Sequence, residues 1–192
     1  MKRLVVFIIL FLGVVNSHGS VPAIDSLLAL LEKPMADTSR IKTLIELHKA
    51  YRFNKDSSIY YIQQAIAIAE KTKDNNFIAR SYVALAWHYN STIKNQDSAL
   101  IIARTTFEKM QQANYLDGMA RACNMITVVY AETQLDSAVY YALKTIELHR
   151  KNNNLNGVNS VKINLSGIYH NMKKYEEAIE VAKEVLLHFE EF

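Results

Sequence analysis

Proline and glycine are scarce in this chain of 192 residues. The prolines are Pro22 and Pro34, and the glycines beyond the first 20 positions are Gly118, Gly157 and Gly167. Architectures made of short β-strands need many tight turns, and tight turns depend on these two residue types. Their scarcity excludes such architectures. It predicts helices along the chain after Pro34, because no proline interrupts them there.

Cysteine is limited to Cys123, which lies in a helical apolar pattern. A lone cysteine has no intramolecular partner, so disulfides do not hold this fold together and packing must do so. Half of the residues are apolar, which is enough to build the core of one domain.

Groupings of residues that carry catalysis or bind a metal are also missing from the sequence. The histidines show no pair at the helical spacing of metal ligands, and no nucleophile is grouped with a base. The scattered glycines cannot form a phosphate-binding loop. Adjacent acids such as Glu176 and Glu177 point to different sides of a helix. We therefore expect no enzymatic activity, no cofactor and no metal site.

The longest apolar run lies at the start of the chain. Lys2 and Arg3 precede an apolar stretch from Leu4 to Val15, and small and polar residues follow at 16–20. This is the pattern of a secretory signal peptide, so we expect residues 1–19 to be removed and the mature protein to be periplasmic or secreted. The stretch is shorter than the ~20 residues of a membrane-spanning helix, which argues against a stable membrane span.

The formal net charge of +3 depends on this predicted signal peptide. Lys2 and Arg3 are two of the 22 basic residues, and all 19 acidic residues come after position 20, so cleavage leaves 20 bases against 19 acids. Such a mature chain lacks the basic surplus that is typical of nucleic-acid-binding domains. We therefore expect no nucleic-acid partner.

A fourfold repeat is the strongest signal in the sequence. An acidic residue, followed within three positions by a small and an apolar residue, recurs at intervals of 41, 39 and 40 positions. A tyrosine ahead of it recurs at intervals of 38, 41 and 39 positions. The acids are Asp56, Asp97, Asp136 and Glu176, and the tyrosines are Tyr51, Tyr89, Tyr130 and Tyr169. A period of this length indicates a solenoid, in which stacked units bury apolar faces that no unit buries alone.

The repeats predict pairs of helices. The second helix of each pair begins at the acidic signature, and the first helix of the pair lies ahead of it. The expected second helices are 56–72, 97–113, 136–151 and 175–190. The expected first helices of the last three pairs are 76–93, 116–133 and 156–172. A short helix is expected within 20–35, and an array of about four pairs within 36–192. Short polar connections make successive helices antiparallel. The expected fold is an all-α, right-handed solenoid.

Small and aromatic side chains recur at the same period. We expect the repeated alanines to be buried where paired helices cross closely, because a larger side chain would overpack the contact. In each tyrosine doublet we expect one ring to face inward and one outward. The alanines are Ala99, Ala138 and Ala178, and the doublets are Tyr60-Tyr61 and Tyr140-Tyr141.

The last unit closely resembles a tetratricopeptide repeat. Its segments Asn164–Tyr169 and Lys174–Ile179 carry a leucine, two tyrosines and an alanine in the places that this family uses. The earlier units match less closely, and the period near 40 is longer than the family's 34. The stretch from Asp56 to Ala69 is similar to one that recurs in exported repeat regions of Bacteroidetes-type signalling proteins. In those proteins the array precedes a membrane helix and an output module.

The resemblance implies a superhelix whose first helices line a concave groove for a protein or peptide. Arginine, asparagine and tryptophan suit such a groove, because forked donors hold carboxylates or carbonyl groups and the indole ring provides an anchor. Counted from the repeated tyrosines, the concave surface carries Lys49, Arg52, Arg80, Val83, Trp87, Asn90, Arg121, Asn124, Val128, Glu132, Ile163, His170 and Asn171. Of these, the expected groove residues that bind the partner are Arg52, Arg80, Trp87, Asn90, Arg121, Asn124 and His170.

The expected function is that of a non-enzymatic, exported scaffold that binds a protein or peptide partner. Two alternatives remain open. One is the sensory region of a truncated membrane signalling protein, either a histidine kinase or a transcriptional regulator. The other is a nutrient-binding or accessory protein at the cell surface.

The final helix adds one further expectation. Residues such as Ile179, Val185 and Leu187 give it more apolar surface than one neighbouring helix covers, whereas the end of a solenoid needs a polar outer face. We therefore expect residues 175–192 to pair with a second copy of the chain or with further repeats.

Overall fold

The structure is a computed structural model that describes residues 24–190, with side chains as far as Leu187. The predicted signal peptide at 1–19 lies outside this range. Within the described range the chain forms helices and no strand. The helices are α1 (Ile24–Leu31), α2 (Asp37–Ala50), α3 (Lys55–Thr72), α4 (Asn75–His88), the π-helical turn η1 (Tyr89–Ile93), α5 (Gln96–Gln112), α6 (Leu116–Tyr130), α7 (Leu135–Lys151), α8 (Leu155–Asn171) and α9 (Tyr175–Glu190).

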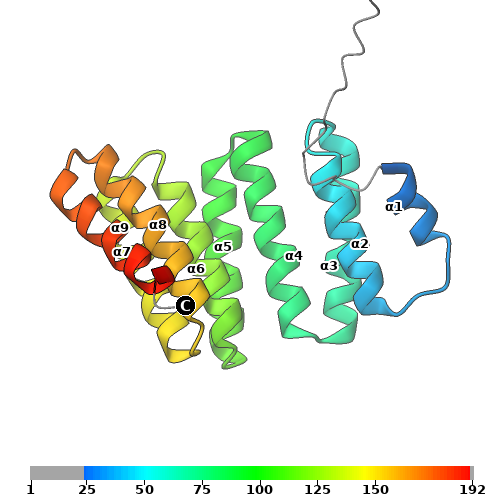
Figure 1. Cartoon of the computed structure of the whole chain (residues 1–192). Coiled ribbons are helices and arrows are strands. Elements are labelled where there is room, and N and C mark those ends of the chain that lie inside the picture. The colour runs from blue at the N-terminus through cyan, green and yellow to red at the C-terminus, as the bar shows by residue number, and fades with distance from the viewer. Residues whose placement is uncertain (1–23, 191–192) are drawn as a thin grey trace, which may run out of the picture.

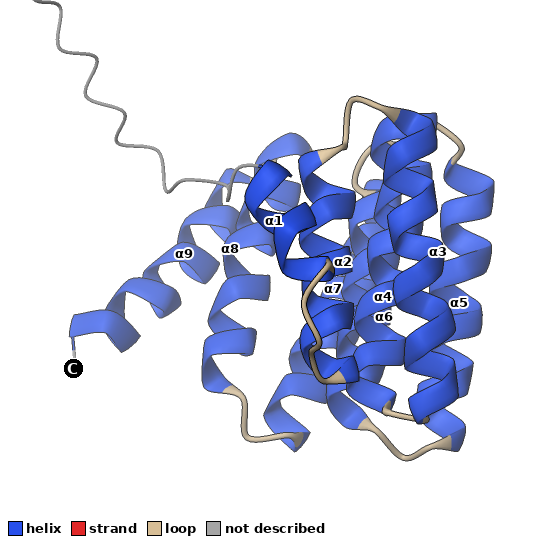
Figure 2. Ribbon diagram, turned by 90° about the vertical axis from the view of Figure 1, so that its right-hand side faces the viewer, coloured by secondary structure: helices blue, strands red, loops and turns tan. Residues whose placement is uncertain are grey.

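After α1, the helices stack as four antiparallel pairs: α2 with α3, α4 with α5, α6 with α7, and α8 with α9 (Figure 1). The first helices α2, α4 and α6 form one layer, and α3 and α5 lie beside it in a second layer (Figure 2). The apolar core runs between the layers and continues from pair to pair. The predicted all-α solenoid is therefore confirmed.

Asparagine side chains cap several helices at the predicted starts. The side chains of Asn54, Asn95 and Asn154 each accept a hydrogen bond from the backbone N–H three residues later, at 2.9–3.0 Å. The signature acids Asp56 and Asp97 follow in the first turn, where a negative charge favours the helix dipole. The acids therefore support helix starts that the preceding asparagines cap.

The helices also end without glycine. Within residues 24–190, five lysine and asparagine residues adopt the left-handed backbone conformation in the connections, with φ between 50° and 61°. Glycine usually takes this position because it has no Cβ. The residues are Lys73, Lys94, Asn114, Asn153 and Lys173. The low glycine content thus leaves the helix ends to residues that tolerate this conformation at some cost.

Tyrosine pairs tie the two helices together in the first and third pairs. In each, the tyrosine near the end of the first helix stacks on the inner ring of the doublet, with centroids 5.4 and 5.7 Å apart, and the outer ring is exposed. The stacked pairs are Tyr51 with Tyr61 and Tyr130 with Tyr141, and the exposed rings are Tyr60 and Tyr140. The prediction for the doublets is confirmed.

The repeated alanines differ in burial. Ala99 and Ala138 are fully buried, as predicted. The prediction was wrong for Ala178, which is only half-buried. The reason is its position in α9, which packs mainly against α8, whereas α5 and α7 have neighbours on both sides.

One predicted helix changes its winding near its end. The sequence pattern predicts a single helix over 76–93, but the α-helix ends at His88 and η1 continues it as a π-turn. A π-turn takes up an additional residue within a helix. The interval from Tyr89 to Asp97 is longer than in the other units, so η1 absorbs the longer connection.

Candidate functional site: a basic groove across three helices

A groove crosses the three first helices α2, α4 and α6. The helices α4 and α6 each contribute four side chains, and α2 contributes three together with Arg52 from the turn that follows it. Each set has the spacing i, i+3, i+4 and i+7, which places side chains on one helical face. The hollow holds about 540 Å³. Its twelve lining residues are Ile45, His48, Lys49 and Arg52; Arg80, Val83, Ala84 and Trp87; and Arg121, Asn124, Met125 and Val128.

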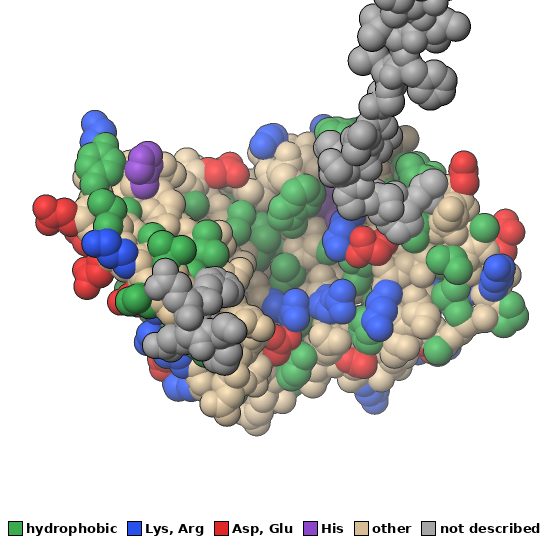
Figure 3. Space-filling view, in the orientation of Figure 1, with side chains coloured by type: hydrophobic (Ala, Val, Ile, Leu, Met, Phe, Trp, Pro, Cys, Tyr) green, Lys and Arg blue, Asp and Glu red, His purple; other side chains and the backbone are tan. Residues whose placement is uncertain are grey.

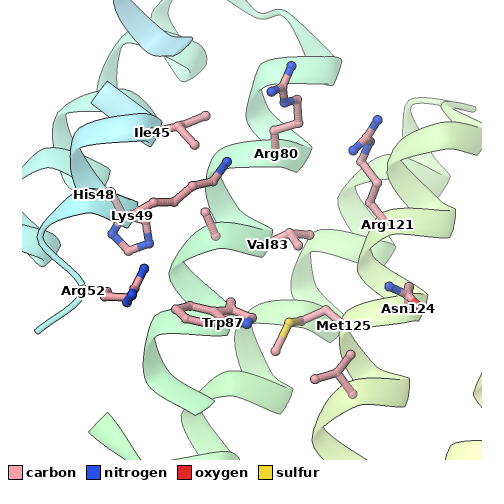
Figure 4. Close-up of a pocket in the computed structure, with 12 residues that line it drawn as sticks. Ile45, His48, Lys49, Arg52, Arg80, Val83, Trp87, Arg121, Asn124 and Met125 are labelled. Carbon is pink, nitrogen blue, oxygen red and sulfur yellow. The ribbon is translucent and has the colours of Figure 1, made fainter. Parts of the chain in front are cut away.

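The floor of the groove is apolar. Val83, Met125 and Val128 contribute aliphatic surface, and Trp87 lies beside Met125 in the close-up view (Figure 4). The indole is 41% exposed, and it is the chain's single tryptophan. An exposed indole on an apolar floor can contact a bound apolar group and can report its arrival by fluorescence.

Basic side chains line one side of this floor. In Figure 3, Lys and Arg side chains form a row across the middle of the face that carries the groove. Figure 4 shows Lys49 extending from α2 toward Arg80, which belongs to α4. Arg121, which belongs to α6, lies on the other side of Arg80. None of the described residues that line the groove is acidic. The groove is therefore suited to an anionic group.

Two of these cations are paired with acids outside the lining. Lys49 Nζ lies 2.7 Å from Glu46 Oε1, and Arg121 Nε lies 2.6 Å from Asp117 Oδ2. Both pairs are exposed, and exposed pairs contribute roughly 0–1 kcal/mol each. Because Arg121 uses Nε for this pair, its two terminal nitrogens can donate to another acceptor.

The other two cations, Arg52 and Arg80, form no ion pair within the described part of the chain. Instead, Arg52 lies over the ring of Phe53 at 4.7 Å, and Arg80 lies 5.8 Å from the ring centroid of Phe77. Neither contact uses all five N–H donors of a guanidinium. Both side chains can therefore bind a carboxylate without first breaking an ion pair.

A buried polar cluster lies directly behind the groove. His48 Nδ1 is 2.9 Å from Ser58 Oγ and 3.0 Å from the carbonyl oxygen of Ser58. The same hydroxyl lies 3.2 Å from His88 Nδ1, and His88 Nε2 is buried without a partner among the described residues. The cluster connects α2, α3 and α4 and so fixes the positions of two helices that line the groove.

Burial determines the charge of this cluster. Desolvation lowers the pKa of His48, although backbone hydrogen bonds with Ser58 and Ala84 act in the opposite direction. Desolvation also lowers the pKa of His88, and repulsion from a protonated His48 and from Lys55 lowers it further. Both rings are therefore neutral near pH 7, and the cluster adds no charge to the groove.

The structure brings together five of the seven expected groove residues: Arg52, Arg80, Trp87, Arg121 and Asn124. Asn90 lies elsewhere, because it belongs to the turn η1, where it is buried and its Nδ2 donates to Glu132 at 3.2 Å. His170 also lies elsewhere. It is exposed on α8, beyond the three helices that form the groove, and its ring contacts Tyr175 at 5.5 Å.

Sequence reasoning did not identify four lining residues, namely Ile45, His48, Ala84 and Met125. Three are apolar or small, so their types carry no signal of binding. Their spacing does carry one, because each completes the same i, i+3, i+4, i+7 set on its helix. Within residues 24–190, no group of three His, Cys, Asp or Glu side chains is placed to hold a metal ion.

Antiparallel helix pairs stacked around a groove define the chain as a tetratricopeptide-type solenoid. Three solved structures show the same fold. Aspartyl phosphate phosphatase F from Bacillus subtilis matches with a TM-score of 0.70 and 14% identity over 88% of this chain and 45% of its own. A signal transduction ATPase with a tetratricopeptide repeat sensor from Pyrococcus horikoshii matches with a TM-score of 0.67 and 16% identity over 86% of this chain and 27% of its own. A putative kinesin light chain from Podospora anserina matches with a TM-score of 0.55 and 16% identity over 87% of this chain and 84% of its own.

The sequence also matches a family model. The model of the SusR N-terminal TPR domain matches residues 21–123 and 102–188, so the chain belongs to this family. The resemblance to tetratricopeptide repeats is thereby confirmed. A search of curated proteins by sequence finds no match.

The matches differ in how much of each relative they cover. The chain spans less than half of the phosphatase and of the signal transduction ATPase, so these likenesses show a shared fold and not a shared activity. None of the helices in residues 24–190 combines the length and apolar character that crossing a membrane requires.

Proposed function

We propose that this protein is a non-enzymatic scaffold that binds a protein or peptide partner in the groove of α2, α4 and α6. The observation that carries the proposal is the repetition of one lining face on the first helices of three successive pairs. An exposed indole and four cations lie on this face. Extended binding surfaces made from consecutive repeats are the usual means of recognition in solenoids.

A selection from a random peptide library tests this proposal. Peptides captured by the parent chain should change the fluorescence of Trp87 and should bind more weakly to the variant Arg80→Ala. The matched control is Arg150→Ala, which removes an exposed arginine from α7. Equal binding by the parent, Arg80→Ala and a Trp87→Ala variant would exclude the groove as the binding site.

A sensory role is a second candidate. The matching family model describes an N-terminal domain, and one structural relative is named for its tetratricopeptide repeat sensor. Both favour a chain that recognises a ligand on behalf of another module. A reading frame that continues past Phe192 into a membrane helix and an output module would support this candidate, and a stop codon there would contradict it.

We further propose that the protein is exported, because residues 1–19 have the three parts of a signal peptide. The intact mass of the protein recovered from outside the cytoplasm should lack this segment. Recovery with the mass of the uncleaved chain would contradict cleavage.

The surface of α9 supports a proposal about assembly. Ile179, Leu186 and Leu187 are each more than half exposed, at 54%, 61% and 61%. We expect this face to pair with a second copy or with further repeats, since isolated solenoids need polar ends. Sedimentation should show association that Leu187→Glu weakens. A monomer at high concentration would exclude pairing between copies.

A further inference from the structure

We propose that a polar hollow beside the turn η1 binds a small zwitterion, and that its ligand is a free α-amino acid. The hollow shares no lining residue with the groove of α2, α4 and α6. The inference therefore goes beyond the proposed binding of a protein or peptide partner, and either proposal can fail without the other.

The hollow lies where the chain departs from its repeat. In the described part of the chain, η1 is the one π-helical segment, and it follows the first helix of the second pair. The wide turn closes where Asn95 N donates to the carbonyl oxygen of Tyr89 at 2.9 Å. The hollow holds about 500 Å³, which lies within the range of about 300–1,000 Å³ that small-molecule sites have. Its lining residues are Asn90, Ile93, Lys94, Asn95, Gln96 and Asp97.

A carboxylate outside the lining fixes two amide side chains of the hollow. Glu132, from the connection after α6, accepts a hydrogen bond from Asn90 Nδ2 at 3.2 Å and from Gln96 Nε2 at 3.1 Å. An ionised carboxylate can only accept, so both amides must present their nitrogen to it. Their oxygens therefore face away from Glu132, on the side of the hollow that both residues line.

The oxygen of Asn90 lacks a hydrogen-bond donor. Asn90 is 2% exposed, and its Oδ1 is buried without a partner among the described residues. Buried amide oxygens in folded proteins nearly always accept a hydrogen bond, because they have lost their contact with bulk water. The hollow thus contains an acceptor that an N–H group of a ligand can satisfy.

Two unpaired charges of opposite sign also line the hollow. Lys94 and Asp97 are exposed, and within residues 24–190 neither forms an ion pair with the other or with any further residue. A ligand with one charge would be attracted by one of these side chains and repelled by the other. A ligand that carries both charges can pair with both side chains.

The helix cap at the start of α5 provides a further donor. Asn95 Oδ1 accepts from the backbone N–H of Ser98 at 2.9 Å. A backbone N–H can only donate, so the cap fixes the Asn95 oxygen and leaves Nδ2 free to donate elsewhere.

These groups divide into two sets that match an α-amino acid. Asn90 Oδ1 and the Asp97 carboxylate accept from an ammonium group, whereas Asn95 Nδ2 and the Lys94 ammonium donate to a carboxylate. A neutral polyol could satisfy the amides, but it would leave both charges unpaired. Charge-assisted hydrogen bonds are the stronger ones, so the lining favours the zwitterion.

Calorimetry of the parent chain with each standard amino acid, at up to about 10 mM, tests this inference. The best ligand is then compared with its N-acetyl form, which lacks the ammonium, and with its amide form, which lacks the carboxylate. Glycerol serves as the polyol probe. We expect one-to-one binding that either blocking group weakens at least about tenfold, because a charge-assisted pair is lost.

Two substitutions with matched controls locate the ligand. Lys94→Gln and Asp97→Asn should each weaken binding at least about tenfold, and both residues are exposed, so the fold should be retained. Lys173→Gln is the control for the first, because Lys94 and Lys173 share a φ of 61°. Asp136→Asn is the control for the second, because Asp136 lies in the first turn of α7 as Asp97 does in α5. Neither control should change binding.

Each contrary result overturns the inference. Absence of heat with every amino acid would show that the hollow does not bind them. Equal binding of the N-acetyl or the amide form would show that the ligand's two charges are not read. Glycerol that binds more tightly than every amino acid would assign the hollow to hydroxyl groups. Full binding by both Lys94→Gln and Asp97→Asn would place the ligand elsewhere. The groove is tested separately, by the peptide library and Arg80→Ala.

Discussion

Replacing Ala138 by leucine should destabilise the protein, whereas the same change at Ala178 should not. The two alanines occupy the same position of the repeat signature, but Ala138 is fully buried and Ala178 is half-buried. Ala138 belongs to a core cluster that also contains Ile126, Val129 and Ile168. Three additional carbon atoms at Ala138 must displace these neighbours, because protein interiors are packed without spare volume.

The expected magnitude follows from the cost of overpacking. Inserting methyl or methylene groups into a packed core costs typically about 1–3 kcal/mol, whereas surface changes stay within about 0.5 kcal/mol. In a chain of this size, 1 kcal/mol lowers the melting temperature by about 2–4 °C. Thermal and urea unfolding of both variants and the parent, followed by circular dichroism, measures the difference.

A matched result in the two variants would refute the reasoning. If Ala138→Leu had the same melting temperature as the parent, α6 and α7 would not cross closely at this residue. If Ala178→Leu lost as much stability as Ala138→Leu, the outer side of α9 would be covered in solution. An unchanged slope of the urea transition would show that each variant unfolds as cooperatively as the parent.

Two further predictions concern glycine and histidine. Gly167→Ala should stabilise the protein by about 0.5–1 kcal/mol, because an added Cβ meets no atom within 4 Å. Gly157→Ala should destabilise it, because an added Cβ would lie 2.6 Å from His149 Nδ1. Equal unfolding free energies for the two variants would contradict this. The folded state holds the pKa values of His48 and His88 below 6.5, so the unfolded chain binds more protons below that value. Stability should therefore be level above about pH 7 and fall as the pH drops through about 6.5, levelling off below the folded pKa values. Urea midpoints measured from about pH 7.5 to 5.5 check this, and a midpoint that rises on acidification would contradict it.

The helices could be predicted from the sequence because their signals are local. The expected second helices begin within one residue of α3, α5, α7 and α9. Asparagine caps, acids in the first turn and apolar spacing act over fewer than five residues, so they are visible in the chain itself. The turn η1 was not predictable in this way, because a longer connection could equally have formed a loop.

The burial of repeated residues was only partly predictable. Ala99, Ala138 and Ala178 look equivalent in the sequence, yet the last of them is half-buried. Burial depends on whether a further helix pair stacks on the same helix, and α9 packs mainly against α8. Position in the stack is a property of the whole array, and no single repeat carries it.

The groove shows the same division. The residue types and the repeated spacing were enough to propose Arg80, Trp87 and Arg121 as neighbours, since they lie on successive first helices. They were not enough to exclude Asn90 and His170, which share the residue types but point elsewhere or lie on a fourth helix. Local periodicity decides where each helix runs. Which faces meet in one groove is decided by packing, because the winding within η1 and the angles between pairs set the direction of every side chain beyond them.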